Sequence, residues 1–354
     1  MRKKFVRIGL VLLIIMIVCT ITVTVLLRNE LRSLASIRQI DDYGMFQMTY
    51  FGDYGFDDFL LVGAESDRDI EIFIMERILR GFPIDLNITG GGCTVFVARN
   101  TAGEVIFGRN FDFPYYSPSM QLFTHPNNGH ASVSTANLLF MGFHEGNLPS
   151  GLNFNSFPVL GAPFLPFDGM NEKGVAIALL AVPKAEPPLN DGRVMLNTTT
   201  TIRLVLDHAA NVDEAIELLM RYNIFFSEGV YCQFLIADAS GRSVIVNYWD
   251  GEVKIIETDE PFQIASNFIP YNNLNIGEGF DEFVRYDRVM AVIEGNGGTL
   301  SEMQAIDLLA EVGVIDDYGE DRLQWTVIYN LSNLSGIIFA NRNTDNLIEF
   351  SLLP

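Results

Sequence analysis

The chain has 354 residues, 49% of them hydrophobic, and a formal net charge of −21 at pH 7. This length allows one large domain or two small ones, with a substantial core. A chain this acidic has little with which to neutralise phosphates, so we expect no nucleic-acid partner. Three cysteines (Cys19, Cys93 and Cys232) exclude a disulfide scaffold. Neither they nor the four histidines have metal-site spacing, and no nucleotide-binding glycine motif is present, so we expect no metal and no cofactor.

The N-terminus predicts a membrane anchor. Residues 1–7 are basic, and residues 8–27 carry no charge, which matches the about 20 apolar residues that cross a bilayer. A cleaved signal peptide is the alternative, but the bulky residues at 25–27 offer no small-residue cleavage site. Basic residues are denser before the run than after it. The positive-inside rule therefore predicts a single-pass protein of the cell membrane with an extracytoplasmic body.

The segment before Cys93 gives one clear helix signal. Residues 28–65 are rich in aromatic residues and Asp, and their irregular alternation predicts no definite element. Residues 66–69 resemble a capping box, and apolar residues at helical spacing follow over 70–79, ending at Gly81. We therefore expect a helix over residues 70–79.

The stretch GGGCTVFVARNTAGEVIFGRNFDF, residues 90–113, reads as a β-hairpin. Its β-branched and aromatic runs cover residues 93–98 and 104–107, with a turn between them. Cys93 opens the first strand, and the hairpin should fold Arg109 and Asp112 back towards it.

The rest of the chain alternates between groups of strands and groups of helices. Residues 114–167 are rich in Phe and Pro, which is typical either of loops around an apolar pocket or of loops packed over a core. A turn is expected over 168–174. Further strands are expected at residues 175–182, 231–237, 243–248, 253–257, 262–266, 324–329, 336–340 and 347–352. Helices are expected at residues 197–210, 212–222, 283–294 and 301–312. Consecutive hairpins predict an α+β fold with antiparallel sheets, and a four-layer helix–sheet–sheet–helix sandwich fits this order.

Cys93 is a candidate nucleophile. A thiol attacks as its thiolate and needs a base or a cationic neighbour, yet no histidine lies in a recognisable partner motif. If the Gly92–Cys93 bond is cut, the new α-amino group, with a reference pKa of about 7.7–8.0, can act as the base. Arg109 would then favour the thiolate and Asp112 would hydrogen-bond the ammonium. From the spacing alone, a buried strand cysteine beside a surface Arg–Asp pair is the commoner interpretation.

The motif GCT at Cys93, followed by GRNFDF, resembles the N-terminal-nucleophile cysteine amidases. These comprise the choloylglycine hydrolases (bile salt hydrolases and penicillin V acylases), acid ceramidase, N-acylethanolamine acid amidase and the penicillin acyltransferases. The similarity runs in order over about residues 90–352, through the motifs DGMNEKG, ADASGRSVIVNYWDGEVKI, IASNF, VRYDRVMAV and QWTVIYNLSNLSGIIFA. It implies the αββα N-terminal-nucleophile fold.

The resemblance also implies roles for single residues. Cys93 would be the nucleophile and its freed amine the base, with Arg109 and Asp112 orienting and activating it. Asn267 would donate to the oxyanion, and Arg285 would complete the polar network.

This sequence departs from the family pattern in two places. A further catalytic asparagine of the bile salt and penicillin V enzymes falls on Ala181, so the second oxyanion donor is open, with the backbone N–H of Thr94 as a candidate. This departure argues against a bile salt hydrolase. The long segment before Cys93 resembles the ceramidase and acyltransferase branches, which cut themselves. We therefore predict autocatalytic cleavage at Gly92–Cys93. The predicted parts are a basic N-terminus (1–7), the anchor (8–27), a juxtamembrane and pre-nucleophile segment (28–92) that stays bound, and the catalytic domain (93–354).

These features predict a membrane-anchored hydrolase of linear, non-peptide amide C–N bonds. The expected substrate is a small N-acyl amide with an apolar, lipid-like acyl group. One alternative is an acyltransferase of the same fold that passes the acyl group to an amine or an alcohol. Another is an anchored binding protein without activity, against which the five retained site residues argue. The sequence determines neither the leaving group of the substrate nor whether the protein forms homo-oligomers.

Overall fold

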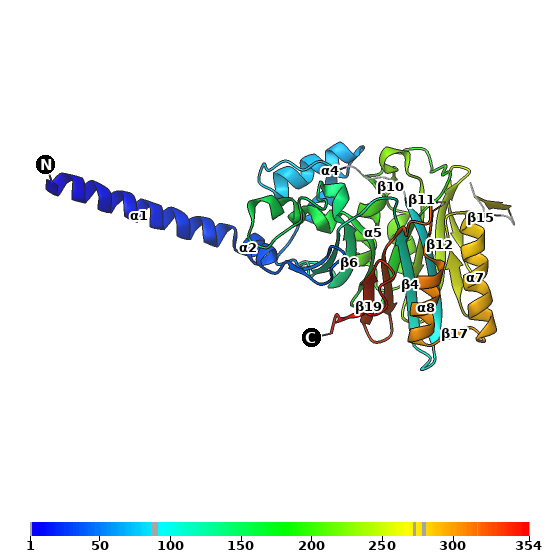
Figure 1. The fold of residues 1–354 in the computed structure, drawn as a ribbon. Coiled ribbons are helices and arrows are strands. Elements are labelled where there is room, and N and C mark those ends of the chain that lie inside the picture. The colour runs from blue at the N-terminus through cyan, green and yellow to red at the C-terminus, as the bar shows by residue number, and fades with distance from the viewer. Residues whose placement is uncertain (1, 87–90, 272–273, 278–280, 317, 354) are drawn as a thin grey trace.

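Two β-sheets lie face to face at the centre of the molecule, and helices cover their outer faces (Figure 1). The computed structural model describes residues 2–86, 91–271, 274–277, 281–316 and 318–353. Neighbouring strands of both sheets are mostly antiparallel. The predicted α+β fold with antiparallel sheets is therefore confirmed.

The larger sheet has nine strands within the described ranges, in the order β1-β2-β5-β6-β7-β8-β11-β12-β13. Their bounds are Arg38–Gln39, Met45–Thr49, Ser119–Thr124, Ser132–Asn137, Pro166–Asn171, Ala176–Ala181, Cys232–Ala237, Ser243–Trp249 and Glu252–Ile256. Apolar residues fill both faces of its central strands, as expected for a sheet covered on both sides.

The second sheet, again counted over the described residues, has seven strands and contains the predicted hairpin. Its strands are β14 (Gln263–Ala265), β3 (Gly92–Asn100), β4 (Val105–Asp112), β18 (Leu323–Asn330), β19 (Ser335–Ala340), β20 (Ile348–Ser351) and β17 (Thr299–Leu300), which pairs with β3. Two short ladders complete the strands: β9 (Met195–Leu196) with β10 (Asn223–Ile224), and β15 (Ile269–Tyr271) with β16 (Leu274–Ile276).

The predicted helix pairs lie on opposite faces of this sandwich. Helices α5 (Thr198–His208) and α6 (Val212–Leu219) contact the larger sheet. Helices α7 (Asp281–Gly295) and α8 (Glu302–Val312) contact the second sheet. Capping boxes fix the starts of α5 and α8, so both helices begin within one residue of the predicted position.

The N-terminal part of the chain forms a series of helices. Its elements are α1 (Arg2–Leu26), α2 (Arg28–Ala35), α3 (Phe56–Val62), α4 (Asp67–Phe73) and a π-helical turn, η1 (Ile74–Ile78). Together α4 and η1 confirm the predicted helix after Ser66, whose side chain caps it. Helix α1 projects from the body (Figure 1). Over the described residues, no helix reaches the length and apolarity needed to cross a bilayer, so the predicted transmembrane helix over residues 8–27 is not found.

Three segments differ from their predicted structure. Residues 168–171 belong to β7, and only the residues after them turn. Strands β13 and β14, expected to pair with each other, lie in different sheets, because β14 pairs with β3 instead. The Phe-rich segment, expected to form loops, contains β5, β6 and two 3₁₀ helices, η2 (Leu138–Met141) and η3 (Phe154–Phe164), whose apolar side chains pack into the core.

The segment before Cys93 is built into the larger sheet. Strand β2 lies between β1 and β5, and it pairs with β5 in parallel. Beyond β2, the hydroxyl of Tyr54 lies 2.7 Å from both carboxylate oxygens of Asp207 on α5. Arg203, one turn before Asp207, forms an ion pair with the same carboxylate at 3.2 Å. This buried network joins residues before the predicted cleavage point to residues after it.

Replacing Tyr54 by Phe is expected to lower the free energy of unfolding by about 1.5–3 kcal/mol, because the variant loses a buried hydrogen bond to a charged group. Urea denaturation of the Cys93→Ala chain, with and without Tyr54→Phe, measures this difference. Tyr318→Phe is the matched control, because Tyr318 is 90% exposed and should change stability by less than about 0.5 kcal/mol. Equal losses in the two variants would show that the Tyr54–Asp207 contact adds no stability.

Candidate active site

The hairpin of β3 and β4 brings Arg109 to the thiol of Cys93, as predicted. Cys93 pairs with Phe111, and Val95 pairs with Arg109 across the ladder. The Nη2 of Arg109 lies 3.7 Å from Cys93 Sγ, and both side chains are buried. A buried guanidinium at this distance favours the thiolate over the thiol.

Arg109 is held by Asp168, a residue that the sequence analysis did not single out. The Nε of Arg109 lies 3.1 Å from Asp168 Oδ2, and both side chains are fully buried. Asp168 also accepts hydrogen bonds from Trp325 Nε1 (3.0 Å) and Tyr329 Oη (2.7 Å). Arg109, Trp325 and Tyr329 therefore converge on one buried carboxyl group. The assignment of residues 168–174 to a turn hid this role. One signal could have revealed this role. Asp168 is an acidic residue of the motif DGMNEKG, which resembles the amidase family and precedes the apolar strand predicted at residues 175–182.

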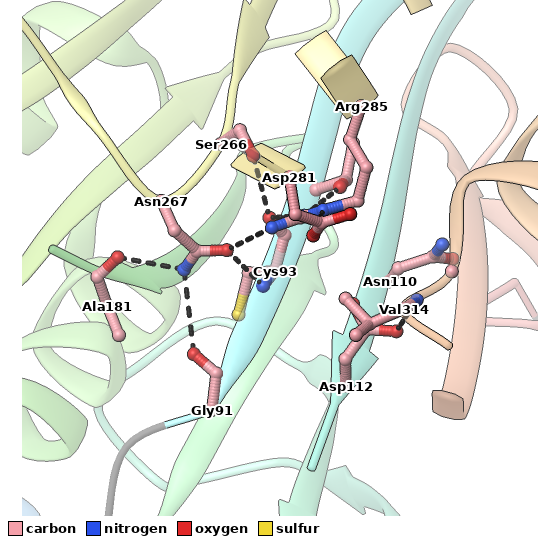
Figure 2. A network of polar contacts seen from close by, with 12 residues as sticks. Gly91, Cys93, Asn110, Asp112, Ala181, Ser266, Asn267, Asp281, Arg285 and Val314 are labelled. Carbon is pink, nitrogen blue, oxygen red and sulfur yellow. Dashed lines mark hydrogen bonds and ion pairs between the residues drawn. The ribbon is translucent and has the colours of Figure 1, made fainter. Parts of the chain in front are cut away.

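The side chains of Asn267 and Arg285 hydrogen-bond to the backbone of Cys93, as Figure 2 shows. The backbone nitrogen of Cys93 donates to Asn267 Oδ1 at 2.7 Å, and Arg285 Nη2 donates to the same oxygen at 3.0 Å. Arg285 Nη1 donates to Cys93 O at 2.7 Å and to Thr94 Oγ1 at 2.6 Å. Asn267 follows β14 and Arg285 lies on α7, so three separate elements meet at Cys93.

The donor end of Asn267 faces two carbonyl groups. Its Nδ2 donates to Ala181 O at 2.8 Å and lies 3.5 Å from Gly91 O. Ala181, at the place of the family's further asparagine, therefore contributes its backbone here. The oxyanion roles of Asn267 and of the Thr94 backbone remain predictions.

Asp112 lies opposite Gly92 in the ladder, beside the bond that is predicted to be cut. Its Oδ1 accepts from Val314 N at 2.8 Å, whereas its Oδ2 has no hydrogen-bond partner among the described residues. Burial raises the pKa of Asp112 to about 6. The predicted partner of Asp112, a free ammonium on Cys93, does not exist in the uncut chain, where the Cys93 nitrogen binds Asn267 instead.

This raised pKa predicts a pH-dependent stability. The folded state binds the Asp112 proton more tightly than the unfolded state, whose reference pKa is 3.8. The penalty for the buried charge is therefore present above pH 6 and is relieved as the pH falls from about 6 to about 4. In the Cys93→Ala chain, stability relative to Asp112→Asn should rise by about 2–3 kcal/mol between pH 7 and pH 4. Urea denaturation at both pH values measures this, and parallel pH profiles would contradict it.

In the uncut chain the thiol of Cys93 is not activated. Burial raises its pKa, and Arg109 only partly opposes that effect. Cys232 is buried in β11, and the thiols of Cys93 and Cys232 are both free. Within the described ranges, no group of three His, Cys, Asp or Glu side chains could hold a metal ion.

Comparison with known proteins identifies the family. A sequence model of the linear amide C–N hydrolases, choloylglycine hydrolase family, matches residues 93–271, which is just over half of the chain. The chain belongs to this family. It is therefore a hydrolase that acts on carbon–nitrogen bonds in linear amides. The family match begins at Cys93 itself.

Solved structures share the fold of this linear amide hydrolase. A conjugated bile acid hydrolase from Clostridium perfringens is 17% identical, with a TM-score of 0.53, over 73% of this chain and 92% of its own. Penicillin V acylase from Agrobacterium tumefaciens is 19% identical, with a TM-score of 0.50, over 73% of this chain and 86% of its own. Among curated proteins, none matches the sequence. The matched structures support the N-terminal-nucleophile fold, and at these identities they say nothing about the substrate.

Proposed function

We propose that this linear amide hydrolase attacks N-acyl substrates with Cys93 and passes through an acyl-enzyme. The main support for this proposal is that three polar side chains converge on Cys93. Arg109 faces the thiol, Asn267 binds the nitrogen and Arg285 binds the carbonyl oxygen of Cys93. An amidase needs this combination of nucleophile, base and fixed donors.

The reaction uses the α-amino group of Cys93 as the base. As Cys93 Sγ bonds to the substrate carbonyl carbon, the thiol proton moves to this amine. The amine then passes the proton to the leaving nitrogen while the carbon–nitrogen bond breaks. Water attacks the thioester, its oxygen joins the acyl carbon as a carboxylic acid, and its proton returns to sulfur through the amine. In this mechanism we assign to Asn267 and Arg109 the stabilisation of the charges that develop.

The base exists only after a cut, so the proposal includes self-cleavage between Gly92 and Cys93. The start of the family match at Cys93 supports this boundary.

Denaturing electrophoresis with N-terminal sequencing tests maturation. The wild type should give two fragments whose masses add up to 39.6 kDa, the larger beginning at Cys93, whereas Cys93→Ala should stay whole. An intact wild-type chain with full activity would contradict the self-cleavage proposal.

A mass-spectrometric screen of N-acyl amides tests the activity. The panel holds acyl ethanolamines, acyl amino acids, penicillin V and conjugated bile acids, and includes the lipid-like amides suggested by the aromatic loops. The cut protein should release free acid from at least one amide, and Cys93→Ala should release none. If the acyl group appears only on an added amine or alcohol, the enzyme is the acyltransferase considered above.

We also propose that α1 anchors the protein to the cell membrane with the catalytic body outside the cytoplasm. The uncharged run over residues 8–27 supports this, and so do the apolar side chains from Leu10 to Val18, all of which are exposed. Fractionation after alkaline carbonate washing tests the anchor. Release of the full chain into the soluble fraction would contradict it.

A further inference from the structure

A polar cavity lies where α1 joins the body beside α2 (Figure 1). Its volume is about 410 Å³, within the range of about 300–1,000 Å³ that is typical of small-molecule sites. The end of α1, the start of α2, the loop after β2 and the end of η1 form its walls. Six residues of its lining are Leu26, Glu30, Tyr50, Asp53, Arg77 and Arg80. None of the site residues around Cys93 lines this junction cavity.

The junction cavity is lined by charges of both signs. Glu30 and Asp53 are acidic, and Arg77 and Arg80 are basic. The Nη2 of Arg80 lies 2.7 Å from Glu30 Oε1, and Asp53 Oδ1 accepts from Gly55 N at 2.6 Å. The two carboxylates would repel an anion, and the two guanidinium groups would repel a cation. A zwitterion, which carries both charges, matches this lining.

Both arginines keep donors for the anionic half of such a ligand. A guanidinium group has five N–H donors. Arg77 pairs with Asp58 through Nη2 alone, and Arg80 uses its Nη2 for Glu30 and for Leu26 O, at 3.5 Å. The side chains of Arg77 and Arg80 are 57% and 53% exposed. Their other N–H groups can bind a phosphate, for which the guanidinium geometry is well suited.

The hydroxyl of Tyr50 is an unused donor in the junction cavity. Tyr50 is only 6% exposed, and its ring packs edge-on against Tyr54 at 5.6 Å between centroids. Its hydroxyl forms no hydrogen bond with the part of the chain that the structure describes. Burial, together with the charges of Glu30 and Asp53, raises the pKa of Tyr50, so the hydroxyl keeps its proton. Both of these carboxylates line the cavity, so the hydroxyl faces it and can donate to a ligand.

The position of the junction cavity indicates where the ligand comes from. Leu26, the last residue of α1, lines the cavity. If α1 lies in a bilayer, the cavity opens at the level of the lipid headgroups. The net charge of −21 disfavours anionic lipids. The carboxylates of Glu30 and Asp53 accept hydrogen bonds, which the ammonium of ethanolamine donates and the trimethylated ammonium of choline does not.

We propose that the junction cavity binds the phosphoethanolamine group of a phosphatidylethanolamine molecule from the membrane that holds α1. The phosphate contacts Arg77, Arg80 and Tyr50, and the ammonium contacts Glu30 and Asp53. This inference rests on the proposed membrane anchor and on nothing at Cys93. A lipid held in this way joins the end of α1 to the body and fixes the orientation of the catalytic domain on the bilayer.

Native mass spectrometry of the full Cys93→Ala chain tests the lipid. The protein is inserted into vesicles of equal phosphatidylethanolamine, phosphatidylcholine and phosphatidylglycerol, extracted in mild detergent, and the retained lipids are counted. We expect at least about five-fold more phosphatidylethanolamine than either other lipid. Equal retention of the three, by a chain that floats with the vesicles after carbonate washing, overturns the headgroup site and leaves the anchor standing. A chain that does not float overturns both.

Soluble compounds distinguish a lipid from a free metabolite. For the same chain in detergent, phosphoethanolamine at about 10 mM should raise the Tm by about 2 °C or more, because it binds only the folded state. Phosphate alone and ethanolamine alone should each raise it by less than half as much, since each fills half of the site. An equal rise with phosphate alone overturns the zwitterion. A rise with phosphoethanolamine, without enrichment of phosphatidylethanolamine, overturns the lipid source.

Two variants locate the site. Glu30→Gln should lower the ratio of retained phosphatidylethanolamine to phosphatidylcholine to within about two-fold of one, because the ammonium loses a charged partner. Glu217→Gln is its control, since it breaks an exposed ion pair with Arg221 on α6. Tyr50→Phe should weaken phosphoethanolamine binding about 5–10-fold, and Tyr318→Phe, at an exposed position, should not. Wild-type lipid retention in both Glu30→Gln and Tyr50→Phe overturns the proposal.

Discussion

Replacing Arg109 by Met is expected to slow the reaction of mature Cys93 with iodoacetamide at pH 7 by about 100-fold. The guanidinium is the buried cation beside the sulfur, at 3.7 Å, and its loss leaves the thiolate without this stabilisation. The same change should lower the free energy of unfolding by about 3 kcal/mol, because it leaves the fully buried Asp168 without its ion-pair partner. Alkylation rates and urea denaturation measure the two effects separately.

The double variant Arg109→Met with Asp168→Asn separates catalysis from stability. The uncharged amide that Asp168→Asn introduces no longer needs a cation, and Trp325 and Tyr329 can still donate to its oxygen. The double variant should regain at least half of the lost stability but none of the lost reactivity. Recovery of reactivity along with stability would show that Arg109 only holds the fold together.

Replacing Asn267 by Asp is expected to slow acyl transfer to Cys93 by about 10²–10³-fold. The Asp side chain keeps the oxygen that accepts from the Cys93 nitrogen and from Arg285 Nη2, but it loses the donor that faces Ala181 O and Gly91 O. The rate of self-cleavage in freshly synthesised chain measures the effect, and so does kcat on the best amide of the screen.

Asn267→Ala provides the comparison for this prediction. It removes both the acceptor and the donor, so it should be at least as slow as Asn267→Asp. If Asn267→Asp keeps the wild-type rate while Asn267→Ala does not, Asn267 acts only by holding the Cys93 nitrogen, and the oxyanion donor lies elsewhere.

The local parts of this site could be predicted from the sequence. The β3–β4 hairpin follows from two β-branched runs around a short turn, and its register brings Arg109 to Cys93 without any distant contact. The start of α5 follows from an Asn cap before a run of threonines. Such features depend on neighbours in the chain, and the residue types there are sufficient to set them.

The parts that escaped prediction depend on contacts between distant segments. Asp168 meets Arg109 only because two different sheets pack face to face, and no spacing within the chain encodes that distance. Strand β14 could pair with several neighbours, and packing under α7 places it beside β3. Strand β2 pairs in parallel with β5 across a long connection, which leaves no hairpin signal in the sequence.

The position of β2 in the larger sheet has a consequence for how the enzyme refolds after cleavage. A cut after Gly92 leaves one continuous sheet made of two polypeptides, with β1 and β2 on the shorter one. The precursor can refold as a single molecule, whereas the mature enzyme must reassemble from two, so its recovery after unfolding should depend on protein concentration. Maturation would thus turn a refolding step that involves one molecule into one that involves two, so that dilution would hinder the recovery of the mature enzyme but not that of the precursor.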